Sequence, residues 1–144
     1  MIRSILIVCV GNICRSPAAE KLFQYKLSDR FTISSAGLHA MVGHAIDPKM
    51  QRYLVNAGIT ELTHQARQFT GEMARQADLI MAMEKVHVHQ ITQAVSHTHG
   101  KTMLLGKWVE DAEVPDPYRR DEAFFAQVYR VIERYVDEWV FKLA

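Results

Sequence analysis

The sequence predicts an α/β protein built on a doubly wound, four-stranded parallel sheet with helices on both faces. Short aliphatic runs alternate with longer segments of helical character along the whole chain, which favours parallel strands joined by right-handed crossovers. The first run, 4–8, is continuously apolar, as expected of a strand that is covered on both faces. A chain of 144 residues can bury a substantial core, so we expect one domain over residues 1–144.

The other elements follow from apolar runs and from the signals that start and end helices. Ser16 followed by Pro17 predicts the start of a helix, and Asp47 followed by Pro48 repeats that signal. Gly58 marks the end of the second helix. We expect strands over 4–8, 31–34, 78–83 and 101–105, and helices over 17–28, 48–57, 70–76, 84–94 and 121–142.

Composition narrows the class of protein. The formal net charge of +1 offers no electrostatic footprint for nucleic acid. The apolar N-terminal run is too short for a secretion signal or a membrane span, so we expect a cytoplasmic protein without membrane insertion. Both cysteines fall in one short segment, which indicates no structural disulfide framework.

The segment 9–17, Cys-Val-Gly-Asn-Ile-Cys-Arg-Ser-Pro, is the strongest functional signal. It joins the first strand to the first helix, and ligands of such sheets bind beyond the carboxyl ends of the strands. Inward-facing backbone N–H groups, the positive end of the helix and the Arg15 guanidinium would together hold a phosphate-like dianion. The same positive field would keep Cys9 as a thiolate nucleophile at neutral pH. The rest of the predicted cradle consists of Val10, Gly11, Asn12, Ile13, Cys14 and Ser16.

Taken alone, a cysteine at the end of a buried strand is more often a small core residue. A candidate acid elsewhere in the chain strengthens the catalytic interpretation. Asp116 lies between Pro115 and Pro117, on a stiff segment that can hold a carboxyl group over an anion site. By itself this segment would be an ordinary turn before the last helix. Together with the cysteine loop (residues 9–17), it favours a general acid at Asp116.

Several segments, in this order, resemble those of the low-molecular-weight protein-tyrosine phosphatases: Val8–Pro17, Ser34–Gly37, His64–Gln68, Asp78–Met83 and Asp116–Tyr118. The likeness extends over essentially the whole chain. The chain is most similar to bacterial members encoded with capsule and exopolysaccharide export systems. Such members act on the autophosphorylated tyrosine cluster of a membrane tyrosine kinase, which the resemblance implies as substrate and partner. We expect the flavodoxin-like strand order 2-1-3-4, and no metal or other cofactor, because the loop itself supplies the positive field.

The resemblance implies a role for each matching residue. Cys9 would be the nucleophile, Arg15 would bind the phosphoryl group, and Asp116 would protonate the leaving phenolate. Ser16 would hydrogen-bond the thiolate. The loop would be braced from behind by Ser35, His64 and Asn12, the last in a left-handed conformation.

The rim of the site departs from the pattern of mammalian relatives. Residues 38–45 include no aromatic side chain, and Arg119 stands where those relatives carry a second tyrosine. Arg119 and Arg120 are expected to attract acidic or phosphorylated residues beside the target tyrosine. We expect an apolar slot for the substrate ring formed by Val10, Ile13, Leu38, Met41 and Tyr118.

Alternative functions of the same loop stay open. Arsenate reductases relay through cysteines outside the loop, and this chain has none. Protein-arginine phosphatases have a similar loop but carry threonine at the position of Ile13. The bulk of isoleucine suits an enzyme that recognises phosphotyrosine better. A non-catalytic phosphotyrosine-binding module is disfavoured, because Cys9, Arg15 and Asp116 occur together.

Two further features allow more than one interpretation. Cys14 is either a small residue that fits the tight loop or a resolving thiol that traps oxidised Cys9 as a disulfide. His87 and His89 are spaced like metal ligands, but residues two apart on a helix face opposite ways, so we expect no metal site there.

Overall fold

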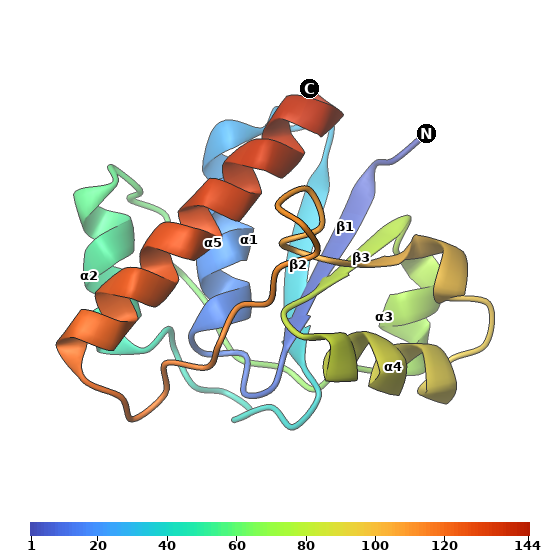
Figure 1. Cartoon of the computed structure of the whole chain (residues 1–144), viewed down its shortest axis with the longest axis horizontal. Helices are drawn as coiled ribbons and strands as arrows, with labels where there is room; N and C mark the ends of the chain where they lie inside the picture. The colour runs from blue at the N-terminus through green and yellow to red at the C-terminus, as the bar shows by residue number, and fades with distance from the viewer.

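The sheet confirms the predicted fold class and strand order. A computed structural model describes all 144 residues. Its strands are all parallel and lie in the order β2-β1-β3-β4: β1 (Ser4–Cys9), β2 (Thr32–Gly37), β3 (Leu79–Ala82) and β4 (Thr102–Leu104). The helices lie between and after the strands in sequence (Figure 1): α1 (Arg15–Lys26), α2 (Pro48–Asn56), α3 (Gly71–Gln76), α4 (Lys85–Ala94) and α5 (Glu122–Leu143), with a short 3₁₀ helix at His99–Lys101. None of these helices combines the length and the apolar character needed to cross a bilayer.

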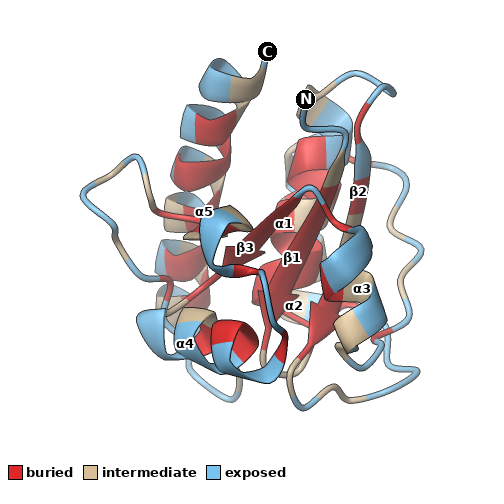
Figure 2. Cartoon of the chain, turned by 90° about the vertical axis from the view of Figure 1, so that its right-hand side faces the viewer, coloured by how far each residue is buried: buried red, intermediate tan, exposed pale blue.

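Each face of the sheet carries its own apolar core, because successive side chains of a strand point to opposite sides. Ile5 and Ile7 of β1 pack in the larger cluster, together with side chains of α1, α2 and α5. Leu6 and Val8 pack in the smaller cluster, together with side chains of α3 and α4. The helices therefore form two layers with the buried strands between them, as Figure 2 shows by the colour of burial.

The start of α1 differs from the prediction. The helix begins at Arg15, and Ser16 is not its N-cap: Cys14 occupies that position and makes no side-chain cap hydrogen bond. The Ser16 hydroxyl contacts Cys9 Sγ and accepts a hydrogen bond from Asn12 instead. The local start signal is thus overridden by tertiary contacts within the loop.

The helix signals around α2 are confirmed. Asp47 Oδ1 accepts the backbone N–H of Lys49 at 2.9 Å, and Pro48 is the first helical residue. Gly58 follows the helix with φ of +94°, a left-handed conformation that favours glycine.

Strand β2 is longer than predicted, and its extension positions the cysteine loop. Residues Ser35, Ala36 and Gly37 continue the pairing with the end of β1, where Gly37 lies opposite Cys9. A Cβ atom at Gly37 would lie 2.4 Å from the carbonyl oxygen of Val10, so only glycine permits this approach. The loop that follows Cys9 therefore lies at the carboxyl edge of the sheet, while both chain termini lie at the opposite edge (Figure 1).

Candidate active site

The cysteine loop forms the wall and floor of a pocket of about 180 Å³. Cys9 is at its floor and only 3% exposed. The backbone N–H of Asn12 donates to Cys9 Sγ at 3.3 Å, and the Ser16 hydroxyl lies 2.9 Å from the same sulfur. Both contacts would stabilise negative charge on the sulfur. The pocket is lined by Cys9, Val10, Gly11, Asn12, Ile13, Cys14, Arg15, His39, Met41, Asp116 and Tyr118.

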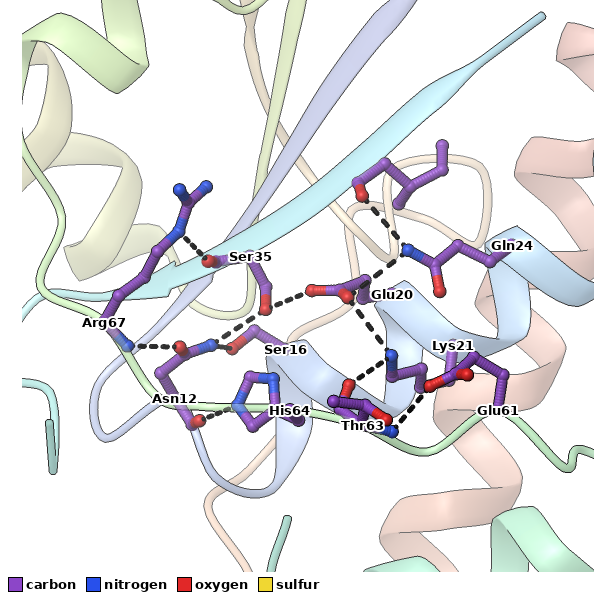
Figure 3. Close-up of polar contacts among 11 residues, drawn as sticks. Asn12, Ser16, Glu20, Lys21, Gln24, Ser35, Glu61, Thr63, His64 and Arg67 are labelled. Carbon is purple, nitrogen blue, oxygen red and sulfur yellow. Dashed lines mark hydrogen bonds and ion pairs between the residues drawn. The ribbon is translucent and has the colours of Figure 1, made fainter. Parts of the chain in front are cut away.

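Asn12 connects the loop to the segments behind it. Its φ is 60°, so it adopts the expected left-handed conformation. Its Nδ2 donates to Ser16 Oγ at 2.8 Å and to Ser35 Oγ at 3.0 Å, while its Oδ1 accepts the backbone N–H of Arg67 at 2.9 Å. His64 Nε2 lies 2.7 Å from the Asn12 carbonyl oxygen, as Figure 3 shows. The structure thus brings together all three residues that were expected to brace the loop.

The bracing network continues into α1, which the sequence analysis did not anticipate. The Ser35 hydroxyl donates to Glu20 Oε1 at 2.5 Å, and Glu20 Oε2 lies 3.7 Å from Lys21 Nζ. Lys21 is only 5% exposed and donates to the carbonyl oxygen of Thr63 at 2.7 Å, next to His64 (Figure 3). The sequence signal for the burial of Lys21 was its place beside Ala18 and Leu22, on the buried side of the helix.

Arg15 is 1% exposed and is held by two segments far away in the sequence. Its Nη1 donates to Glu84 Oε2 at 2.7 Å and to the Val114 carbonyl oxygen at 2.9 Å. Its Nη2 lies 3.7 Å from Asp116 Oδ2, across the pocket. Glu84 was missed by sequence reasoning, although it follows β3 at the carboxyl edge of the sheet, where such folds place functional groups.

Asp116 is carried by a segment that is tied to the β3–α4 junction. The Val114 N–H donates to the Met83 carbonyl oxygen at 2.9 Å, and Glu113 Oε2 accepts the Lys85 N–H at 2.7 Å. Asp116 Oδ1 accepts the Tyr118 N–H at 3.0 Å, and 48% of the Asp116 side chain is exposed. The carboxyl group is therefore fixed at the pocket mouth and remains open to an incoming ligand.

The rim is partly as predicted. Val10, Ile13, Met41 and Tyr118 line the pocket, but Leu38 does not, and this part of the prediction was wrong. Leu38 packs against the smaller core cluster with Ala36, because the alternation of β2 continues past its end. The next residue, His39, lines the pocket instead.

The two rim arginines lie outside the pocket lining. Arg119 has a left-handed φ of 63°, and its guanidinium lies 5.2 Å from the centre of the Tyr118 ring. Arg120 lies 4.0 Å from the centre of the Phe124 ring. Both guanidinium groups thus stack on aromatic rings, and of these two rings only that of Tyr118 lines the pocket.

Cys14 is free and buried in the pocket wall. Burial, and after it the Asp47 carboxylate, raises the pKa of the Cys14 thiol far above its ordinary range. Cys14 is therefore a neutral thiol at neutral pH.

A thiol that accepts the Asn12 N–H, with an arginine and a carboxyl group in the same pocket, is suited to moving a phosphoryl group onto sulfur. On this fold, the arrangement defines a cysteine-dependent phosphatase. A model of the family described as low molecular weight phosphotyrosine protein phosphatase matches residues 4–144. The chain therefore belongs to this family and is a protein-tyrosine phosphatase.

Two individual relatives agree with this assignment, and a third, less similar in sequence, is named as an arginine phosphatase. The chain is 44% identical over 141 residues to the low molecular weight protein-tyrosine-phosphatase Etp of Escherichia coli (strain K12), covering 98% of this chain and 95% of Etp. The crystal structure of the tyrosine phosphatase Wzb from Escherichia coli K30 in complex with sulphate matches with a TM-score of 0.94 and 40% identity, over 100% of both chains. The YwlE arginine phosphatase from Geobacillus stearothermophilus matches with a TM-score of 0.91 but 28% identity, over 98% of this chain and 92% of YwlE.

Proposed function

We propose that the protein hydrolyses phosphotyrosine through a phosphocysteine intermediate on Cys9. The observation that carries this proposal is the meeting of Cys9, Arg15 and Asp116 in one pocket. The Cys9 thiolate attacks phosphorus, a sulfur–phosphorus bond forms, and the bond from phosphorus to the phenolic oxygen breaks. Arg15 and the loop N–H groups bind the equatorial oxygens of the phosphoryl group throughout.

Asp116 supports both chemical steps. A tyrosyl leaving group has a pKa of ~10 and departs poorly as an anion, so Asp116 donates a proton to it. A positioned acid contributes roughly 10²–10⁴-fold to the rate. Asp116, then a carboxylate, accepts a proton from the water that attacks the phosphocysteine, which releases phosphate and restores the thiolate.

Tyrosine is favoured over arginine as the phosphorylated residue. The branched side chain of Ile13 is 7% exposed and contributes to the wall of the pocket, with Met41 and Tyr118 further out. These side chains suit the faces of a phenyl ring, and the aliphatic side chains of Ile13 and Met41 offer no oxygen acceptor to the N–H groups of a phosphoguanidinium. Side-by-side assays of p-nitrophenyl phosphate, a phosphotyrosine peptide and phosphoarginine test this preference, and faster turnover of phosphoarginine would contradict it.

We further propose that the substrate is the phosphorylated tyrosine cluster of a membrane-associated tyrosine kinase of capsule or exopolysaccharide export, met in the cytoplasm. Arg119, whose guanidinium stacks on the pocket residue Tyr118, and its neighbour Arg120 support binding of an acidic, multiply phosphorylated segment. Replacement of both by glutamate should raise KM for such a peptide and leave KM for p-nitrophenyl phosphate unchanged. An unchanged KM for the peptide would remove both arginines from substrate recognition.

Two variants test the chemistry directly. Asp116→Ala should slow a phosphotyrosine peptide far more than an aryl phosphate with an acidic leaving group, because only the former needs a proton on leaving. Protein quenched during turnover should carry a phosphoryl group on Cys9 by mass spectrometry. Full turnover by Cys9→Ala would refute the mechanism.

A further inference from the structure

His87 is a buried titratable side chain that the proposed mechanism does not use. It lies on α4, one turn after Glu84, and is only 4% exposed. Its Nε2 is 3.7 Å from Glu84 Oε2, the same oxygen that accepts the hydrogen bond from Arg15 Nη1. Its Nδ1 is buried and has no hydrogen-bond partner. A buried polar atom without a partner is rare in native proteins and indicates a role that outweighs its cost.

The surroundings of His87 favour one form of the ring. The charged groups around it are the guanidinium of Arg15 and the carboxylates of Glu84, Asp116 and Glu113. Burial, and after it the charge of Arg15, lowers the pKa of His87, so the ring is neutral at neutral pH. A proton on Nε2 points an N–H toward the Glu84 carboxylate. A proton on Nδ1 would instead leave a buried donor unpaired and turn a lone pair toward that carboxylate, so the Nε2–H tautomer is favoured.

Glu84 needs such support. It is the N-cap residue of α4, but its side chain makes no cap hydrogen bond and turns to Arg15 instead. The Glu84 side chain is 31% exposed, so water competes for its carboxylate, whereas Arg15 is enclosed. A neutral, enclosed imidazole beside the carboxylate limits its movement without adding a second positive charge that would draw it away from Arg15.

We propose that His87 is a positioning residue for phosphoryl binding: it keeps Glu84 on Nη1 of Arg15, so that the remaining edge of the guanidinium faces the pocket. This inference rests on the role proposed for Arg15. His87 itself touches neither the substrate nor the reacting atoms, and it acts only through Glu84.

The test measures competitive inhibition by orthovanadate of p-nitrophenyl phosphate hydrolysis. His87→Phe replaces the imidazole with a planar ring that has no donor, and should raise the inhibition constant about fivefold, a typical coupling for neighbouring groups. His87→Gln keeps an N–H donor and should restore most of the affinity. The matched control is His89→Phe on the exposed side of the same helix, which should leave the inhibition constant unchanged.

A double-mutant cycle separates positioning from packing. In a Glu84→Gln background, His87→Phe should have no further effect on vanadate, because its path to Arg15 is already removed. An unchanged inhibition constant in His87→Phe, or the same fivefold loss in the Glu84→Gln background, overturns the proposal. If His87→Phe does not fold, His87→Leu enters the same cycle.

Arg15→Lys distinguishes a failure of the role proposed for His87 from a failure of the role proposed for Arg15. If Arg15→Lys keeps the vanadate affinity of the wild type, the role of Arg15 fails and the inference fails with it. If Arg15→Lys weakens vanadate and His87→Phe does not, only the inference about His87 fails.

Discussion

Asn12→Ala removes the side chain that ties the cysteine loop to the elements behind it. The substitution deletes the hydrogen bonds from Nδ2 to Ser16 and Ser35 and the bond that Oδ1 accepts from Arg67. Asn12 is 0% exposed, so water does not replace these contacts. At about 1 kcal/mol for each hydrogen bond the loss is about 3 kcal/mol. Alanine in the left-handed conformation adds about 1 kcal/mol, so we expect the free energy of unfolding to fall by about 4 kcal/mol.

Urea denaturation followed by circular dichroism measures this loss, provided that the dependence on urea concentration keeps the same slope. Asn12→Gly is the matched control: it loses the same hydrogen bonds but accepts φ of 60°, so it should be about 1 kcal/mol more stable than Asn12→Ala. The rate constant kcat should fall in both variants, because Asn12 orients Ser16 toward Cys9 Sγ. A loss below about 1 kcal/mol in Asn12→Ala would refute the proposed brace, because a single hydrogen bond would account for it.

Three further outcomes follow from single features of the structure. Gly37→Ala places a Cβ 2.4 Å from the Val10 carbonyl oxygen, so thermal denaturation should show that the free energy of unfolding falls by about 1–3 kcal/mol. A variant as stable as the wild type would contradict the close approach. The folded state lowers the pKa of His87 below its unfolded value of 6.5. The free energy of unfolding should therefore be at its full value above pH 6.5 and fall as the pH drops below it, because protonation of the buried ring then favours the unfolded state. His87→Phe should remove this part of the pH dependence, and an unchanged profile would exclude His87 as its source. After peroxide treatment, a reductant should recover less activity in Cys14→Ala than in the wild type, each relative to its untreated protein. Because the pKa of Cys14 is raised, the protective disulfide should form faster as the pH rises; equal recovery in both proteins would leave Cys14 as a packing residue.

The sequence predicts the parts of this site that are contiguous or bear a strong local constraint. The loop from Cys9 to Arg15 lies between an apolar strand and a helix, so its position at the carboxyl edge of the sheet follows from the fold class. Asp116 is found because its flanking prolines stiffen a segment that would otherwise be ordinary. Both predictions depend on short stretches of chain whose local conformation can be inferred without knowing which other segments pack against them.

The parts that sequence reasoning missed depend on contacts between distant segments. Glu84 is an unremarkable acid at a helix start until the fold places it 2.7 Å from Arg15. Lys21 resembles a solvated lysine until α1 packs against the segment that carries Thr63. Leu38 was expected in the pocket, but His39 lines it instead, because neighbouring side chains point to opposite sides as the alternation of β2 continues past its end.

Arg15 is the point at which three separate segments meet. It begins α1 after the loop of β1, its Nη1 contacts Glu84 after β3, and the same nitrogen contacts Val114 in the segment that carries the acid. The acid segment is in turn bonded to the residues on either side of Glu84, through Val114 to Met83 and through Glu113 to Lys85. A shift of the β3–α4 junction would therefore move the guanidinium and Asp116 together. The geometry between the phosphoryl-binding group and the proton donor is thus set by one junction of the fold, which explains how a half-exposed carboxyl group on an irregular segment can be held accurately over the nucleophile.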